Sequence, residues 1–285
     1  MTRFRQIIAA LLFTLLAAEI AHALPKASNV RGGVALIRLG AVSRHESPPR
    51  AWLGEQQILV ARENGQWIAV VGLALDLPLG PHELRVETGD EQKILHFEVV
   101  NKRYPEQRIT LKDSSKVQLS PADEERAVRE IETIQKLKRH WREVNDNAND
   151  SDSTFVLPAA GRLASRFGLR RFFNGEPRAP HSGLDLAVAR GTPIKASAHG
   201  KVLATDDYFF NGKTVFIDHG NGLISMYCHL ERIDVQAGDS VDQGQPIGRS
   251  GMTGRASGPH LHWSVVLNGV MVDPELFVTA NPKTR

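Results

Sequence analysis

Residues 248–263 read GRSGMTGRASGPHLHW, and this stretch decides how the C-terminal half of the chain is organised. Four glycines and one proline predict a loop that bends tightly. The loop ends in His260, Leu261 and His262 at the start of an apolar run, WSVVL. Because residues two apart on a strand face the same side, both imidazoles are expected on one face and Leu261 on the other. Two adjacent histidines on a strand suit a metal ligand and a neighbouring acid or base.

The composition is that of a globular protein. The chain has 285 residues, of which 41% are hydrophobic and 24% charged, so one large or two modest domains are expected. The net charge is only +3 and no basic run is long, which argues against nucleic acid as a partner. Cys228 is the only cysteine, so no internal disulfide can form and the apolar core must hold the protein together.

Residues 1–23 have the pattern of a secretory signal peptide. Two arginines precede an apolar run over residues 7–18, and the tripeptide AHA at residues 21–23 is typical of a cleavage site. A membrane anchor is the alternative, but the run is short for a span and Glu19 closes it. We therefore expect secretion across the inner membrane and no stable membrane insertion after cleavage.

Residues 24–118 are expected to form a small β-sandwich. Short strand-like segments recur between turn signals, at residues 34–39, 57–62, 66–71, 82–87, 93–100 and 108–111. Asn64-Gly65 supplies the positive φ angles of a tight hairpin turn, and residues 108–111 are expected to close the set. No catalytic constellation is present in this region, which favours a spacer or binding module.

Residues 119–154 are predicted to be one connecting helix and a polar linker. Ser120 is a suitable N-cap, and Asp123 three residues later completes a capping box. Apolar residues follow at helical spacing, namely Ala127, Ile131, Ile134, Leu137, Trp141 and Val144. This stripe is expected to pack against one of the domains. Residues 145–153 are almost purely Asn, Asp and Ser, as in an exposed linker.

Residues 155–285 show further strand and turn signals, together with more candidate ligands. His181 and Asp185 are four residues apart, an even spacing that lets both meet one ion on an extended segment. A later apolar strand contains His229. Strand alternation places Tyr227 with His229 on one face and Cys228 with Leu230 on the other. Cys228 is therefore expected to be a core thiol rather than a metal ligand.

In order and surroundings, five residues resemble the lysostaphin/LytM family of zinc metallopeptidases, which cut peptide bonds in bacterial peptidoglycan: His181, Asp185, His229, His260 and His262. The matching segments are HSGLD at 181–185, GTPIKASAHGKV at 191–202, IDHGNG at 217–222, YCHL at 227–230, GDSVDQGQPIG at 238–248 and SGMTGRASGPHLHW at 250–263. The resemblance covers about residues 155–277. It implies a mainly β fold whose C-terminal domain is a LytM-like antiparallel sheet.

The resemblance also implies roles for these residues. His181, Asp185 and His262 would hold Zn²⁺ and leave the fourth position to water, which would attack the scissile carbonyl. His260 would act as general base, and His229 would help to stabilise the developing charge. Tyr208 stands where the family often has an aromatic residue near the substrate groove, although the residues after it depart from the usual spelling. It is a candidate substrate-binding residue.

Two functions follow from this resemblance. The first is a hydrolase, a zinc metalloendopeptidase that cuts peptidoglycan peptide stems, acting as a monomer in the periplasm. The second is a non-catalytic LytM-like adaptor that activates a cell-wall amidase. Degenerate relatives of that kind usually lack several ligands, and all five residues are present here. The two remaining histidines of this region, His199 and His219, are expected to be structural.

Overall fold

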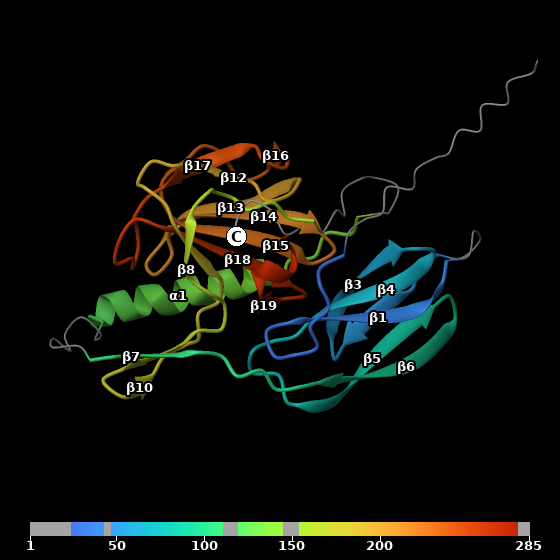
Figure 1. The fold of residues 1–285 in the computed structure, drawn as a ribbon. Coiled ribbons are helices and arrows are strands. Elements are labelled where there is room, and N and C mark those ends of the chain that lie inside the picture. Colours follow the sequence, from blue (N-terminus) through green and yellow to red (C-terminus); the bar gives the residue numbers. More distant parts are fainter. Residues whose placement is uncertain (1–23, 43–46, 111–118, 145–153, 279–285) are drawn as a thin grey trace, which may run out of the picture.

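The computed structural model describes residues 24–42, 47–110, 119–144 and 154–278. Within them the fold is mainly β with one α-helix, which confirms the expected fold class (Figure 1). The predicted signal peptide and the polar stretch of the linker, residues 145–153, lie outside the described residues.

An antiparallel sheet of six strands forms the N-terminal part, in the order β1-β4-β3-β2-β5-β6. The strands are β1 Val34–Ala41, β2 Arg50–Leu53, β3 Gln56–Glu63, β4 Gln66–Gly72, β5 Gly80–Thr88 and β6 Glu91–Val99. The sheet folds over on itself, and every strand contributes to the core between its halves. Asn64 and Gly65 take positive φ at the β3–β4 turn, as expected. β2 was not predicted because four residues are too few to show a period.

The strand predicted at residues 108–111 does not close this sheet, so that expectation is wrong. β7, Glu106–Ile109, instead runs parallel to β9, Arg170–Phe173. With β10, Glu176–Pro177, they form a separate three-stranded sheet in the order β10-β9-β7 (Figure 1). The partner of β7 lies some sixty residues further along the chain, which local periodicity could not indicate. The β9–β10 hairpin is thereby tied to the segment that leaves the N-terminal sheet.

A ten-stranded antiparallel sheet forms the C-terminal part. Its main path is β16-β13-β14-β15-β18-β11-β8, and β12, β17 and β19 pair beside that path. The elements are β8 Arg162–Ser165, β11 Leu184–Ala187, β12 Pro193–Lys195, β13 Gly200–Tyr208, β14 Gly212–Gly220, β15 Leu223–Ile233, β16 Ser240–Val241, β17 Pro246–Ser250, β18 Leu261–Leu267, β19 Val270–Val272 and the 3-10 turn η3 Pro274–Leu276. One face of this sheet packs into the main core around Tyr227 and Trp263, both fully buried.

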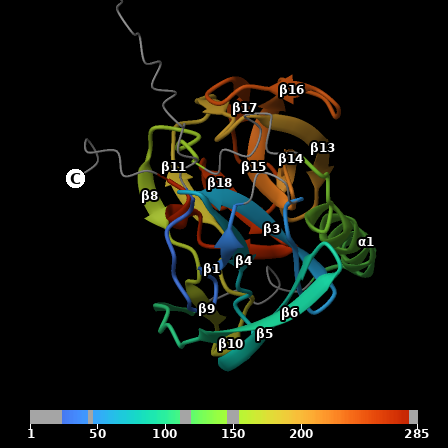
Figure 2. The ribbon, with the colours of Figure 1, turned by 90° about the vertical axis from the view of Figure 1, so that its right-hand side faces the viewer.

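The other face of the ten-stranded sheet is covered in part by α1, Pro121–Lys138. Ile134 and Leu137 of α1 pack on a cluster that includes Phe216 and Cys228. Figure 2 shows α1 beside β13 and β14. Cys228 is 1% exposed and free, which confirms a core thiol, and burial raises its pKa to about 12. No helix in the described part of the chain is long and apolar enough to traverse a bilayer.

The helix begins as predicted but ends earlier. Ser120 is the N-cap, and its hydroxyl accepts a hydrogen bond from the backbone N–H of Asp123 at 3.2 Å. The helical stripe was expected to continue to Val144, which is wrong. After Lys138 the chain extends along the β14–β15 turn, where the Val144 N–H donates to Asn221 Oδ1 at 3.0 Å. This pairing with a distant turn replaces the last helical turns.

Candidate active site

Two neighbouring strands and one loop bring three of the predicted residues together. Asp185 on β11 and His262 on β18 are direct partners in the antiparallel register. His181 was expected to share an extended segment with Asp185, but it lies before β11. Its backbone N–H donates to Leu169 O at 3.0 Å and its carbonyl accepts from Gly168 N at 2.8 Å. These two backbone bonds to the loop before His181, not strand alternation, fix where His181 lies.

The three side chains converge on one point. His181 Nε2 lies 2.9 Å from Asp185 Oδ1 and 3.0 Å from His262 Nδ1, and the latter two atoms are 2.8 Å apart. Each residue therefore offers one potential metal-ligating atom, and these three atoms lie within 4.8 Å of one another. Among the described residues, no other group of three His, Cys, Asp or Glu side chains meets this condition.

The remaining ring nitrogens orient both ligands. His181 Nδ1 donates to the Arg166 carbonyl at 2.9 Å, and a carbonyl oxygen can only accept. His262 Nε2 lies 2.9 Å from the hydroxyl of Ser264, which is fully buried. With the proton on these nitrogens, His181 Nε2 and His262 Nδ1 present lone pairs toward Asp185 Oδ1. The residues thus fit a divalent cation that prefers nitrogen and carboxylate ligands, such as zinc.

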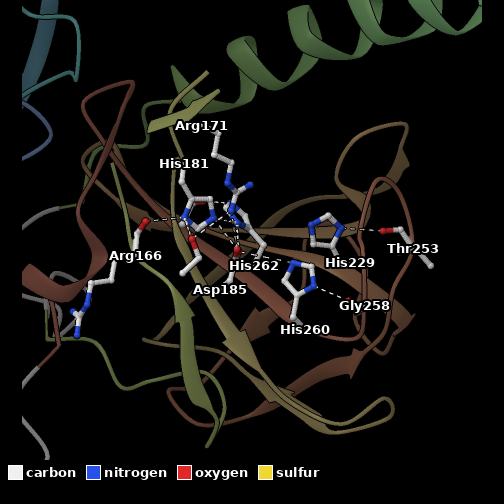
Figure 3. Close-up of polar contacts among 11 residues, drawn as sticks. Arg166, Arg171, His181, Asp185, His229, Thr253, Gly258, His260 and His262 are labelled. Atoms are coloured by element: carbon white, nitrogen blue, oxygen red, sulfur yellow. Dashed lines mark hydrogen bonds and ion pairs between the residues drawn. The ribbon is translucent and has the colours of Figure 1, made fainter. Parts of the chain in front are cut away.

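His229 and His260 form a second pair beside this triad (Figure 3). Their ring centroids are 4.7 Å apart, and His260 Nε2 lies 3.9 Å from Asp185 Oδ1. Each ring donates from Nδ1 to a loop carbonyl, His229 to Thr253 at 2.9 Å and His260 to Gly258 at 2.8 Å. Both rings therefore present an unprotonated Nε2 toward the site. The two carbonyls belong to the loop that precedes β18, so this loop sets both tautomers.

The surroundings of Asp185, His262 and His229 shift the pKa values of all three side chains. Burial alone would raise the pKa of Asp185, but the close imidazoles of His181 and His262 favour the charged carboxylate and hold that pKa well below its usual range. Burial lowers the pKa of His262, and it lowers the pKa of His229 to about 4. At neutral pH the carboxylate is therefore charged and both rings are neutral.

His229 sits on β15 at an irregularity that sequence alternation did not predict. Its φ of 62° is in the left-handed region, which is costly for a residue other than glycine. Beyond this point the alternation is reset. Leu230 packs in the main core with Tyr227, whereas Cys228 lies in the cluster beneath α1, so the expectation that Cys228 and Leu230 share a face is wrong. The distortion turns the His229 ring toward His260.

The other predicted residues lie elsewhere. Tyr208 is 3% exposed and packs edge-on against Phe216 beneath α1, so it is not among the side chains that line the site. His219 is buried and hydrogen-bonded to the His199 carbonyl at 2.7 Å and to the Ser225 hydroxyl at 2.8 Å, which is a structural role. His199 is exposed and lies 3.3 Å from Asp242.

Two residues near the triad were not singled out from the sequence. Ser264 follows His262 by two residues on β18, so strand alternation could have placed it on the same face. Arg171 on β9 lies with Nη2 3.6 Å from Asp185 Oδ2. Its position depends on the pairing of β9 with β7, for which the sequence gives no signal.

Two family models match the chain. The model of peptidase family M23 matches residues 179–274, and the model of the M23 N-terminal domain matches residues 27–102. A solved structure described as an M23 peptidase from Pseudomonas aeruginosa is 42% identical, with a TM-score of 0.73. That similarity covers 88% of this chain and 95% of the Pseudomonas chain.

Curated relatives match the C-terminal part. The peptidoglycan DD-endopeptidase ShyA of Vibrio cholerae is 38% identical over 125 residues, which is 44% of this chain and 29% of ShyA. The DD-carboxypeptidase/endopeptidase Mpg of Neisseria meningitidis is 37% identical over 122 residues, which is 43% of this chain and 28% of Mpg. The matched part thus spans less than a third of the length of these relatives.

Proposed function

The chain belongs to peptidase family M23, and from this membership and the geometry of its site we propose that it is a zinc metalloendopeptidase acting on the peptide cross-links of bacterial peptidoglycan. The observation that carries the proposal is the convergence of His181, Asp185 and His262 within 4.8 Å, with a second pair of histidines beside them. The relatives named as DD-endopeptidases support the choice of peptidoglycan as substrate.

The proposed metal ligands are His181 Nε2, Asp185 Oδ1 and His262 Nδ1. Two neutral imidazoles and one carboxylate are a ligand set that zinc accepts in open catalytic sites. When bound, the ion supplies Lewis-acid polarisation to the scissile carbonyl and to the attacking water. The protein fixes the tautomer of His181 through the Arg166 carbonyl, and the Ser264 hydroxyl can accept a proton donated by His262 Nε2.

The proposed general base is His260. Its Nε2 faces the triad as a lone pair, and the bond from Nδ1 to Gly258 O stabilises the ring once Nε2 has accepted a proton. His229 presents Nε2 in the same way. It can donate to developing negative charge only when protonated, and burial, which lowers its pKa to about 4, opposes that form in the resting site. His229 is therefore proposed to stabilise the developing negative charge only after the His229–His260 pair has taken up a proton.

The adaptor function is not favoured by any feature of this site. A chain that only binds a partner needs no oriented metal ligands, yet backbone carbonyls fix the tautomers of His181, His229 and His260. Export through the signal peptide, action in the periplasm and a monomeric state remain part of the proposal. The net charge of +3 is compatible with work beside an anionic polymer.

Digestion of purified, directly cross-linked peptidoglycan tests the proposal. The zinc-loaded protein is incubated with the polymer, and the fragments are identified by mass spectrometry. We expect dimeric fragments to become monomers with the gain of one water per cut. His262→Ala should lose both zinc and cleavage, and His260→Ala should keep zinc and lose cleavage. His199→Ala, outside the site, is the control. A zinc-loaded wild type that leaves every cross-link intact would refute the enzyme and leave the adaptor.

A further inference from the structure

The guanidinium of Arg171 lies at the edge of the triad and is incompletely satisfied (Figure 3). Its Nη2 is 3.3 Å from Ser165 Oγ and 3.6 Å from Asp185 Oδ2. Its Nε is buried and has no hydrogen-bond partner within the described residues. A buried donor without an acceptor is costly, so such an atom in a native protein needs an explanation. The side chain is nevertheless 32% exposed, which leaves part of the group open to a ligand.

The two carboxylate oxygens of Asp185 face different partners. Oδ1 lies 2.9 Å from His181 Nε2 and 2.8 Å from His262 Nδ1, whereas Oδ2 faces Arg171. At 3.6 Å the ion pair with Arg171 is longer than a good charge-assisted hydrogen bond and is not the bidentate arrangement that arginine favours. The carboxylate of Asp185 therefore holds the guanidinium next to the triad without using up its donors.

The neighbouring arginine shows what a purely structural role looks like on the same strand. Arg170 Nη1 is 2.7 Å from Glu106 Oε1, and the Arg170 guanidinium also lies over the ring of Phe172. Arg166, also near the site, is paired with Glu275. Arg166 meets the triad only through its backbone carbonyl, which accepts from His181 Nδ1, whereas Arg171 contacts Asp185 through its guanidinium. Arg170 is therefore a matched control on β9.

We propose that Arg171 binds a carboxylate of the substrate and makes the enzyme specific for amides whose nitrogen-bearing carbon carries a free carboxylate. The proposal deepens the proposed function and rests on it. A direct cross-link between D-Ala and diaminopimelate has such a carboxylate beside the scissile nitrogen, whereas a cross-link made of glycine has none there. The scissile carbonyl must lie at the triad, so this carboxylate lies within reach of a guanidinium that contacts Asp185. The planar fork of arginine matches a carboxylate, and the exposed part of the Arg171 side chain leaves room for one to bind.

Two cross-linked peptides that differ only at this carboxylate provide the test, one with the free acid and one with the carboxamide. For the wild type we expect kcat/KM to favour the acid by about 10- to 100-fold, the range of a charge-assisted hydrogen bond. Arg171→Gln should lose about that factor on the acid and treat both peptides alike. Arg170→Gln should keep the preference. Zinc content should stay at one equivalent in all three proteins.

The alternative is that Arg171 only positions Asp185. In that case Arg171→Gln would slow both peptides equally or lose zinc, and either result overturns the proposal. Binding to the His260→Ala background supplies a second readout that needs no turnover. There the acid should bind more tightly than the carboxamide, and adding Arg171→Gln should abolish the difference. If the wild type cleaves neither peptide, the proposed function fails, whereas the binding preference still decides the role of Arg171.

Discussion

Removal of one buried hydroxyl should weaken the metal centre without touching a ligand. Ser264 is fully buried, and its Oγ lies 2.9 Å from His262 Nε2. In Ser264→Ala the Nε2–H of His262 loses its acceptor. The ring proton is then free to move to Nδ1, the nitrogen that must bind the metal as a lone pair. Loss of such an outer partner typically lowers metal affinity about 10- to 100-fold, and an unsatisfied buried donor costs about 1–3 kcal/mol of stability.

Ser225→Ala is the matched control for this experiment. Ser225 is also fully buried in the same sheet, and its hydroxyl lies 2.8 Å from Nε2 of His219, a histidine outside the triad. The control should lose a similar amount of stability and keep the wild-type zinc affinity. Zinc affinity is measured by competition with a chromophoric chelator, and the stability of the metal-free protein by urea unfolding.

The two outcomes that contradict this reasoning are distinct. If Ser264→Ala binds zinc as tightly as the wild type, the hydroxyl does not fix the His262 tautomer. If Ser225→Ala loses as much affinity as Ser264→Ala, the loss reflects general destabilisation of the sheet. Only a loss confined to Ser264→Ala supports the orientation of His262 described above.

Three further predictions concern the scaffold. Burial lowers the pKa of His219 from 6.5 to about 4, so between these values the unfolded chain binds a proton that the folded chain does not. Lowering the pH from 7 to 5 should therefore remove about 2 kcal/mol of stability through this residue. Urea unfolding of His219→Gln should show a pH dependence of stability that is smaller by that amount. If the variant and the wild type show the same pH dependence, His219 is not its source. Gly183→Ala should lower the thermal midpoint and reduce the free energy of unfolding by about 1–3 kcal/mol, because the added Cβ would lie 2.4 Å from the Trp263 carbonyl oxygen. An unchanged midpoint in calorimetry would show that the backbone around Gly183 adjusts freely. Ser120→Ala should cost about 1 kcal/mol in urea unfolding through loss of the cap on the Asp123 N–H, whereas Ser120→Asp should not; equal losses in both would contradict the capping role.

Strand alternation predicted part of the site from sequence. His260 and His262 both face Asp185, at 3.9 Å and 2.8 Å from its Oδ1, while Leu261 between them is fully buried in the core. The rule succeeded here because this segment is regular and half of it faces the core. The sandwich hairpin at Asn64 was predictable for a similar reason, since positive φ has a clear residue preference.

Other features depend on contacts between distant segments, which a local pattern cannot reveal. His229 takes a left-handed φ that no neighbouring glycine signals, and its N–H donates to Asn211 O at 2.8 Å. β7 pairs with β9 and not with the N-terminal sheet. Arg171 reaches Asp185 from that same β9. These features were missed because each is fixed by tertiary pairing rather than by periodicity.

Anomalous diffraction at the zinc edge, from crystals of the zinc-loaded protein, would locate the metal relative to the three proposed ligands. We expect one strong anomalous peak bounded by His181 Nε2, Asp185 Oδ1 and His262 Nδ1, with His260 and His229 outside bonding distance of it. A peak at another group of residues, or none in protein that binds zinc in solution, would contradict the assignment of the metal centre.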